Sequence, residues 1–154
     1  MTVLTAPAVL AGCLAAALSA GAAFADNSLV GFPEDHAEGL HYGTVERGNI
    51  TEELYTDREA IEAAKRGEPF PSGTVITLVD YRGGDLHRYV VMEKRDGWGA
   101  LSPAGTGAGD WLFREFAADG TPNPAEDGTR CMSCHRPQAR QDFVFTVDRM
   151  KSVE

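Results

Sequence analysis

Hydrophobic residues in the middle of the chain come in short β-branched and aromatic runs, separated by turn residues. Residues 74–81 and 86–94 form two such runs around the sequence RGGD, and Pro71-Ser72-Gly73 precedes the first run. Two runs joined by a glycine-rich turn are typical of a β-hairpin. The pattern therefore predicts an antiparallel pair of strands.

Two later runs predict further strands, WLFREF at 111–116 and FVFTV at 143–147. Asp96-Gly97 marks another turn, and the pieces SPAGTGAGD and ADGTPNPAEDG have the composition of loops. Four or five antiparallel strands with one or two short helices define the expected fold class. We expect an α+β domain that is mainly antiparallel β-sheet.

One helix is predicted over AIEAAKRG, before the first of these strands. Thr56 and Glu59 have the spacing of a capping box, in which a threonine at the N-cap pairs with a glutamate three residues later. Gly67 and Pro69 are typical helix-ending residues.

The first 25 residues predict an export signal. They carry no charged side chain and end in Ala23-Phe24-Ala25, the small-x-small pattern of a signal peptidase site. Cleavage there leaves residues 26–154 as one modest domain and predicts a periplasmic location. The alternative is a lipoprotein, because Leu10-Ala11-Gly12 precedes Cys13 as in a lipoprotein cleavage box.

The net negative charge of the chain argues against one class of partner, nucleic acid. The chain has a formal net charge of −9, from 14 Lys plus Arg and 23 Asp plus Glu. Such a surface repels nucleic acid, so no nucleic-acid partner is expected. We interpret the acidic charge as a feature that keeps the protein soluble, rather than as an electrostatic docking face.

The strongest chemical signal is CMSCH at 131–135, the two cysteines of the predicted mature chain with a histidine behind the second. On a helical turn, Cys131, Cys134 and His135 project from nearly the same face. This arrangement is typical of haem c attachment, in which two thiols add across the vinyl groups and the histidine binds the iron. We therefore expect one covalent haem, with His135 as the metal ligand.

Three other interpretations of this motif stay open, each with less support. A redox disulfide needs a βαβ unit around the motif, and only about 20 residues follow it. Zinc needs four ligands, whereas the sequence has no second cysteine pair. A structural disulfide between Cys131 and Cys134 would close a very small loop.

With the motif placed, the chain resembles the cytochrome P-460 family and its relative cytochrome c-prime-beta. The resemblance rests on LYTDREAIEAAKRGEPFPSGTVI, VVMEKRDGWG, DWLFREF and CMSCHRPQARQDFVFT, in that order. It implies an antiparallel-sheet cytochrome, a homodimer, and one covalent haem with His135 as proximal ligand. Family members bind or transform small nitrogen species such as nitric oxide or hydroxylamine.

The chain departs from the hydroxylamine-oxidising members at one position. In those members a lysine on the strand after FPDGT is cross-linked to the porphyrin, and the matching residue here is Leu78. The chain has three lysines, Lys65, Lys94 and Lys151, and none lies on that strand. The sequence therefore favours binding of a diatomic ligand, or electron transfer with a redox partner protein. The alternative is an oxidoreductase that acts on hydroxylamine or nitric oxide.

The sixth iron ligand is left open by the sequence. Candidate ligands are Met92, Met150, His36, His41 and His87, each of which is also explained as a core or surface residue. The family resemblance favours an open sixth position under an aromatic or apolar cap, for which the candidates are Phe70, Trp111, Phe113 and Phe116.

Acidic residues near the motif are further candidates. Asp142 is placed to accept a hydrogen bond from His135, although an exposed aspartate at a strand end explains it equally well. Three further carboxylates lie in the loop before the motif and are candidates for a distal proton acceptor: Asp119, Glu126 and Asp127. Ordinary solvation of a loop is the favoured explanation for them.

Overall fold

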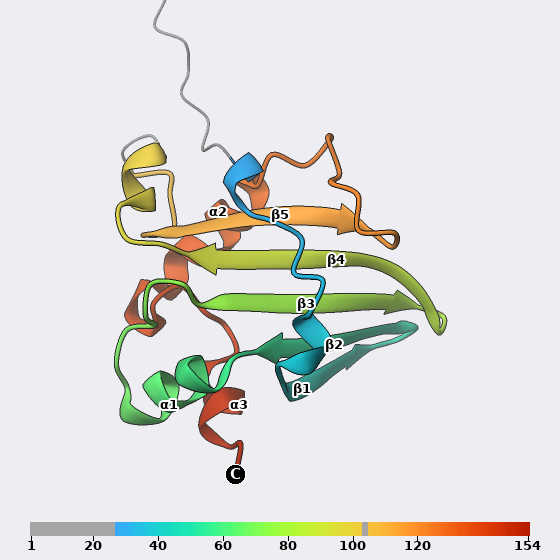
Figure 1. The fold of residues 1–154 in the computed structure, drawn as a ribbon, viewed down its shortest axis with the longest axis horizontal. Coiled ribbons are helices and arrows are strands. Elements are labelled where there is room, and N and C mark those ends of the chain that lie inside the picture. The colour runs from blue at the N-terminus through green and yellow to red at the C-terminus, as the bar shows by residue number, and fades with distance from the viewer. Residues whose placement is uncertain (1–26, 103–104) are drawn as a thin grey trace, which may run out of the picture.

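A computed structural model describes residues 27–102 and 105–154 of the chain. Its centre is a five-stranded antiparallel sheet in which the strands follow one another in sequence order (Figure 1). The strands are β1 (Leu40–Arg47), β2 (Ile50–Thr56), β3 (Val75–Arg82), β4 (Asp85–Lys94) and β5 (Trp111–Ala117). The expected α+β class, mainly antiparallel sheet, is confirmed.

The predicted hairpin is β3 and β4, which pair from Val75 with Glu93 to Arg82 with Asp85. Gly83 and Gly84 form the turn, with φ angles of 61° and 92°. Two consecutive positive φ angles are those of a type I′ turn, whose twist matches that of the flanking strands. The two glycines therefore determine the pairing next to the turn, Arg82 with Asp85 and Tyr81 with Leu86, and the register shifts by one residue between Asp80 and Tyr81.

The run FVFTV at 143–147, predicted as a strand, is not one. Asp142 and Phe143 have φ angles of 48° and 64°, which turn the chain out of the extended conformation. Val147 then begins the short helix α3 (Val147–Lys151). Val144 and Val147 are buried, so the run supplies apolar residues to the core without a strand partner.

Helix α1 (Arg58–Arg66) confirms the predicted helix but not its predicted cap. Asp57 is the N-cap, and its side chain accepts a hydrogen bond from the Ala60 amide at 2.7 Å. Thr56 ends β2 instead, and its hydroxyl donates to the Val75 carbonyl. Aspartate is as good a cap as threonine, so the sheet decides which residue takes the role.

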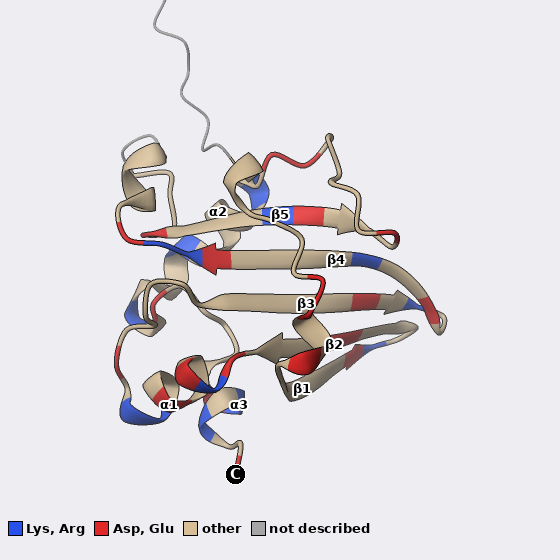
Figure 2. Ribbon diagram, viewed as in Figure 1, with Lys and Arg blue, Asp and Glu red and all other residues tan. Residues whose placement is uncertain are grey.

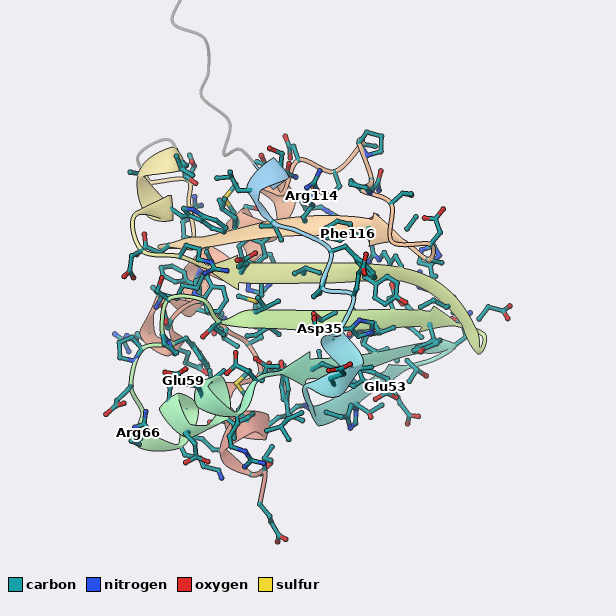
Figure 3. All side chains as sticks on the ribbon, in the orientation of Figure 1. Asp35, Glu53, Glu59, Arg66, Arg114 and Phe116 are labelled. Atoms are coloured by element: carbon teal, nitrogen blue, oxygen red, sulfur yellow. The ribbon has the colours of Figure 1, made fainter. Side chains whose placement is uncertain are left out.

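The two faces of the sheet are covered differently (Figure 1). One face is crossed by the segment 27–38, which contains two turns of 3-10 helix, η1 (Asn27–Leu29) and η2 (His36–Glu38). Phe32 of this segment packs on Tyr89 and Phe116. Arg114, which lies beside Phe116 on β5 (Figure 3), donates to the backbone carbonyls of Ser28 and Val30.

The opposite face carries the C-terminal part of the chain. Helix α2 (Thr129–His135) contacts β5, a 3-10 helix η4 (Arg136–Gln141) follows it, and α3 contacts α1 and β1. A further 3-10 helix, η3 (Trp98–Leu101), connects β4 to β5. Within residues 27–102 and 105–154, no helix has the length and apolar character to cross a membrane. The predicted signal segment 1–25 and Cys13 lie outside the described residues.

The cap of α1 generates a stability prediction. Asp57→Ala removes the acceptor for the Ala60 amide, so we expect the free energy of unfolding to fall by about 1 kcal/mol. Chemical denaturation followed by circular dichroism measures it. Asp35→Ala is the control, because Asp35 precedes η2 without a side-chain cap bond and should change stability by less than about 0.5 kcal/mol. Equal effects of the two substitutions would contradict the assignment of the cap.

Candidate functional site

A cavity of about 700 Å³ lies between the sheet and the C-terminal part of the chain. The sheet contributes mainly aliphatic side chains to its wall, namely Val45, Leu54, Ile76, Leu78, Val90 and Met92. Helix α2 contributes Cys131, Cys134 and His135, and the following segment contributes Val144, Phe145 and Thr146. The three residues of the CxxCH motif therefore meet at one wall of a largely apolar cavity.

Helix α2 presents the motif in the way that helical spacing predicts. Cys131 and Cys134 are free thiols, the first half-buried and the second exposed. Burial raises the pKa of the Cys131 thiol to about 11, so the thiol is neutral near pH 7. Met132 lies between them in sequence and is buried in the core, which anchors the helix.

The His135 imidazole is held on three sides. Its Nδ1 lies 2.7 Å from the carbonyl oxygen of Phe143, and its ring packs between Phe113 and Phe145 at centroid distances of 4.7 and 4.9 Å. Burial lowers the pKa of His135, which favours the neutral imidazole. A carbonyl can only accept, so Nδ1 carries the proton and Nε2 keeps a lone pair that can bind a metal.

Asp142 does not have the role suggested by the sequence. Its carboxylate accepts hydrogen bonds from Lys94 Nζ at 2.6 Å and from the Phe70 amide at 2.8 Å. The partner of His135 is the backbone carbonyl of the next residue, Phe143. A backbone acceptor has no residue-type signature, so the sequence offered no signal for it.

Paired charges form one end of the cavity wall. Arg47 pairs with Glu52 at 2.6 Å, and Arg88 pairs with Glu115 at 2.5 Å. Arg130, from α2, also lines the cavity. Figure 2 shows both acidic and basic residues on β3, β4 and β5. The sequence alone does not single out these residues, because only the antiparallel register brings them together.

Arg88 also pairs with Asp80, its partner across the sheet on β3, whose side chain is fully buried. Arg82 binds the same carboxylate at 2.9 Å. Burial alone would raise the pKa of Asp80, but hydrogen bonds from Arg82 and Arg88 outweigh it and hold the pKa below its ordinary value of 3.8. Arg88, which lines the cavity, is therefore held by two carboxylates, those of Asp80 and Glu115.

Of the five candidate sixth ligands, Met92 alone lines the cavity. Met150 is buried in α3, away from the cavity wall. His36 makes an edge-to-face contact with Tyr89 on the opposite sheet face, His41 pairs with Glu53, and His87 is exposed on β4. The three histidines are therefore explained without a metal.

The four aromatic candidates for a cap also differ in whether they line the cavity. Phe113 lines the cavity and packs on His135. Phe70 and Trp111 pack on each other outside the cavity wall, and Phe116 packs on Phe32 on the other face. Of these four residues Phe113 alone lines the cavity, where the other side chains from β1 to β4 are mainly aliphatic.

The loop carboxylates before α2 have local structural roles. Asp119 accepts from Thr121, Glu126 pairs with Arg130, and Asp127 accepts from the Thr129 amide. None of the three lines the cavity. These local contacts agree with loop solvation, the favoured interpretation of the three residues.

Leu78 points into the cavity, at the position where the cross-linked lysine of the hydroxylamine-oxidising members is expected. The three lysines of the chain lie elsewhere. Lys65 pairs with Glu62 on α1, Lys151 pairs with Asp148 on α3, and Lys94 pairs with Asp142.

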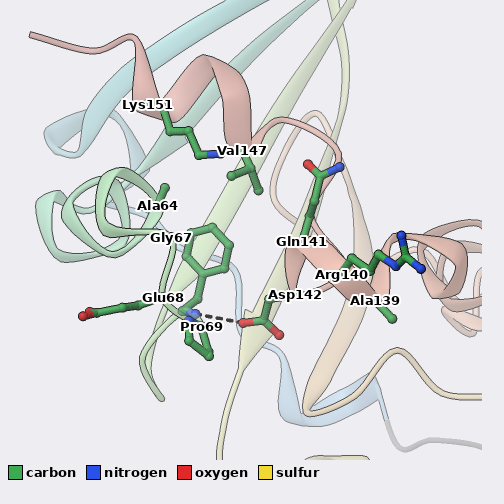
Figure 4. A pocket seen from close by; sticks show the side chains of 11 residues that line it. Ala64, Gly67, Glu68, Pro69, Ala139, Arg140, Gln141, Asp142, Val147 and Lys151 are labelled. Carbon is green, nitrogen blue, oxygen red and sulfur yellow. Dashed lines mark hydrogen bonds between the residues drawn. The ribbon is translucent and has the colours of Figure 1, made fainter.

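A smaller hollow of about 380 Å³ lies between α1 and the C-terminal segment (Figure 4). Phe70 and Asp142 line it, and none of the three motif residues does. Among residues 27–102 and 105–154, no three His, Cys, Asp or Glu side chains gather as a metal site.

The comparisons with known proteins agree with the geometry. The model of the family described as Cytochrome P460 matches residues 33–146, which include the sheet, α1 and the CxxCH motif. The chain therefore belongs to the cytochrome P460 family, and membership implies a haem cofactor. A comparison with curated proteins finds no match.

The residues around the cavity fit that cofactor. The volume lies within the range of about 300–1,000 Å³ that is typical of ligand sites, and the wall is mainly apolar, as a porphyrin requires. His135 offers a neutral nitrogen whose other ring nitrogen is already hydrogen-bonded, which is the usual state of a metal-binding histidine.

The charged end of the cavity generates a prediction on pH. Because the pKa of Asp80 is lowered by folding, its contribution to stability is full above the ordinary value of 3.8 and is lost as pH falls through the folded pKa. We expect Asp80→Asn to lower the free energy of unfolding by about 1–3 kcal/mol at pH 7. The difference from the unsubstituted protein should shrink below about pH 4. Urea denaturation at a series of pH values measures it, and a difference independent of pH would contradict the ionic role.

Proposed function

We propose that this protein is an exported c-type cytochrome with one haem, which binds a small diatomic ligand such as nitric oxide, transfers electrons, or does both. The observation that carries the proposal is the meeting of Cys131, Cys134 and His135 at one wall of a single apolar cavity. The hydrogen bond from His135 Nδ1 to the Phe143 carbonyl, which leaves Nε2 for iron, adds to it.

Each residue of the motif has a separate task. Each thiol adds across one vinyl group, so that a carbon–sulfur bond forms and the thiol hydrogen passes to the neighbouring carbon without an oxidant. Cys131 and Cys134 would hold the cofactor in this way, and His135 would supply a nitrogen ligand to the iron. When bound, the haem supplies an iron that binds diatomic ligands and changes oxidation state. Phe113 and Phe145 keep the imidazole ring in one orientation.

Binding of a diatomic ligand is supported by the character of the sheet wall. Val45, Leu54 and Leu78 are side chains that cannot coordinate iron. Met92 is the one candidate sixth ligand on this wall, and its strand neighbours are Ile76 and Phe113. Phe113 contacts His135 as well, so Met92 and His135 share this neighbour. If Met92 does not bind the iron, the sixth position would be open to a small molecule.

An oxidoreductase is the second candidate, because Glu52 and Glu115 lie in the cavity wall. A carboxylate close to iron-bound hydroxylamine could accept a proton. Both carboxylates are occupied, however, Glu52 by Arg47 and Glu115 by Arg88 and by the Asn123 amide at 2.7 Å. Leu78 offers no cross-link to the porphyrin. The binding and electron-transfer proposal is therefore preferred.

Export to the periplasm, assembly as a homodimer and a redox partner protein complete the proposal. Export is supported by the uncharged residues 1–25, which end in a signal peptidase pattern. The homodimer is supported by the family resemblance. The net charge of −9 is consistent with a soluble exported protein without a nucleic-acid partner.

Covalent attachment is tested by substitution of the two cysteines. Cys131→Ala with Cys134→Ala should give a protein whose haem is fully extracted by acid acetone, because only thioethers resist that treatment. The unsubstituted mature protein should have the intact mass of residues 26–154 plus one haem, with no further loss of hydrogen. A tryptic haem peptide that contains Lys65, Lys94 or Lys151 would favour the hydroxylamine oxidase instead.

Ligand binding is tested by the optical spectrum of the reduced protein with and without carbon monoxide. An open sixth position predicts a full spectral change at low carbon monoxide concentration. Met92→Leu conserves volume in the wall and should leave the spectrum before the addition unchanged. A reduced protein that resists carbon monoxide until Met92 is replaced would show methionine ligation and would favour electron transfer alone.

A further inference from the structure

Two consecutive residues after the CxxCH motif have an unusual backbone conformation. Asp142 and Phe143 have φ angles of 48° and 64°, and among the described residues no other non-glycine residue has a positive φ. A left-handed conformation is unfavourable for a bulky residue such as phenylalanine. Such strain persists only where surrounding contacts hold it, and it concentrates at functional sites.

The contacts that hold Asp142 come from distant parts of the chain. Its Oδ2 accepts from Lys94 Nζ at 2.6 Å and from the Phe70 amide at 2.8 Å, the second of which Figure 4 shows. Lys94 Nζ also donates to the Phe70 carbonyl at 2.8 Å. The three residues thus form a closed set of hydrogen bonds that ties the loop 67–70, the end of β4 and the strained turn together.

Lys94 is a firm anchor for this set. Its backbone is bonded in both directions, to the Thr74 carbonyl at 2.9 Å and from the Gly73 amide at 2.7 Å. Its side chain is only 11 % exposed, and the ammonium group lies over the Trp111 ring. A lysine is rarely buried unless it is paired, so the Asp142 carboxylate accounts for its position.

The strained turn determines how the carbonyl and the ring of Phe143 are oriented. Its carbonyl is directed at Nδ1 of His135, at 2.7 Å. Its ring lies against Gly109, where a Cβ atom would come within 2.5 Å of Cε2, so a glycine is required there. The ring of Phe143 and the preceding residue, Asp142, are therefore both fixed in place. Together they fix the direction of the Phe143 carbonyl, which faces His135 Nδ1.

We propose that Lys94 and Asp142 are positioning residues that hold the Phe143 carbonyl on His135 Nδ1 and thereby set the donor strength of the axial histidine. This inference rests on the proposed role of His135 as the iron ligand. A carbonyl that accepts the Nδ1 proton increases the basicity of Nε2, which strengthens the bond to iron and favours the oxidised state. Loss of the pair should weaken that hydrogen bond without removing the ligand.

The test uses the full-length haem protein and three variants, Lys94→Met, Asp142→Asn and the double variant. Asparagine has the shape of aspartate and tolerates a left-handed φ, so Asp142→Asn removes the charge while the turn can form. Lys65→Met is the matched control, because Lys65 forms a surface ion pair with Glu62 on α1. His135→Gly tests the assumption about the ligand.

Two readouts report on the iron ligand and would not move if the pair were only structural. The first is the iron–histidine stretching frequency of the reduced protein by resonance Raman spectroscopy, which should fall in the three variants. The second is the reduction potential, which should rise by about 59 mV or more, the equivalent of a tenfold change in a one-electron equilibrium. Tenfold is the lower end of the effects known for partners of metal-binding histidines.

The double variant should match the larger single effect, because the two residues act through one carbonyl. Unchanged frequency and potential in Lys94→Met and Asp142→Asn, within the spread of Lys65→Met, would overturn the inference. Should Lys94→Met fail to fold, Asp142→Asn decides alone. An unchanged iron spectrum in His135→Gly would instead overturn the proposed function, so the two failures are distinguishable.

Discussion

The apolar face that the sheet leaves uncovered is the constraint on which the rest of the structure depends. One face is closed by the chain itself, through Phe32 and its aromatic neighbours. On the other face, Leu54, Ile76 and Leu78 border a cavity of about 700 Å³. Apolar surface left in water costs about 25 cal/mol per Å², so a group that fills the cavity would contribute directly to stability. The haem cofactor that family membership implies is such a group, and it would complete the core of a small domain.

The fold was predictable where local chemistry and tertiary context agree. The hairpin of β3 and β4 has β-branched strands and a Gly83-Gly84 turn, so its existence and direction follow from the sequence alone. Strands β1 and β2 were not predicted, because their polar residues, such as Arg47 and Glu52, hide the alternation expected of a half-buried strand. The strand predicted over residues 143–147 was wrong for the opposite reason. Its composition favours a strand, but the contacts of Asp142 force a turn, and those contacts come from residues 48 and 72 positions earlier in the sequence.

The same distinction applies to the site. The CxxCH motif is local, so helical spacing was enough to predict that Cys131, Cys134 and His135 share one face. The residues around them depend on strand register and on long-range packing. The ion pair of Arg88 and Glu115 depends on strand register and long-range packing, and so do the rings that hold His135. Sequence reasoning selected ligand types such as histidine and methionine, whereas most of the wall is aliphatic and has no distinctive residue type.

The two ends of the cavity suggest a division of tasks that bears on the choice between binding and catalysis. At one end, His135 is neutral, enclosed by aromatic rings and hydrogen-bonded to a backbone carbonyl, which suits a permanent axial ligand. At the other end, each carboxylate is held by an arginine, and Arg88 is itself held by Asp80. A carboxylate in such a network must break charge-assisted hydrogen bonds before it can accept a proton from a bound substrate. The arrangement is therefore better suited to keeping charge balanced beside an apolar pocket than to repeated proton transfer, and it favours a ligand that binds without giving up a proton.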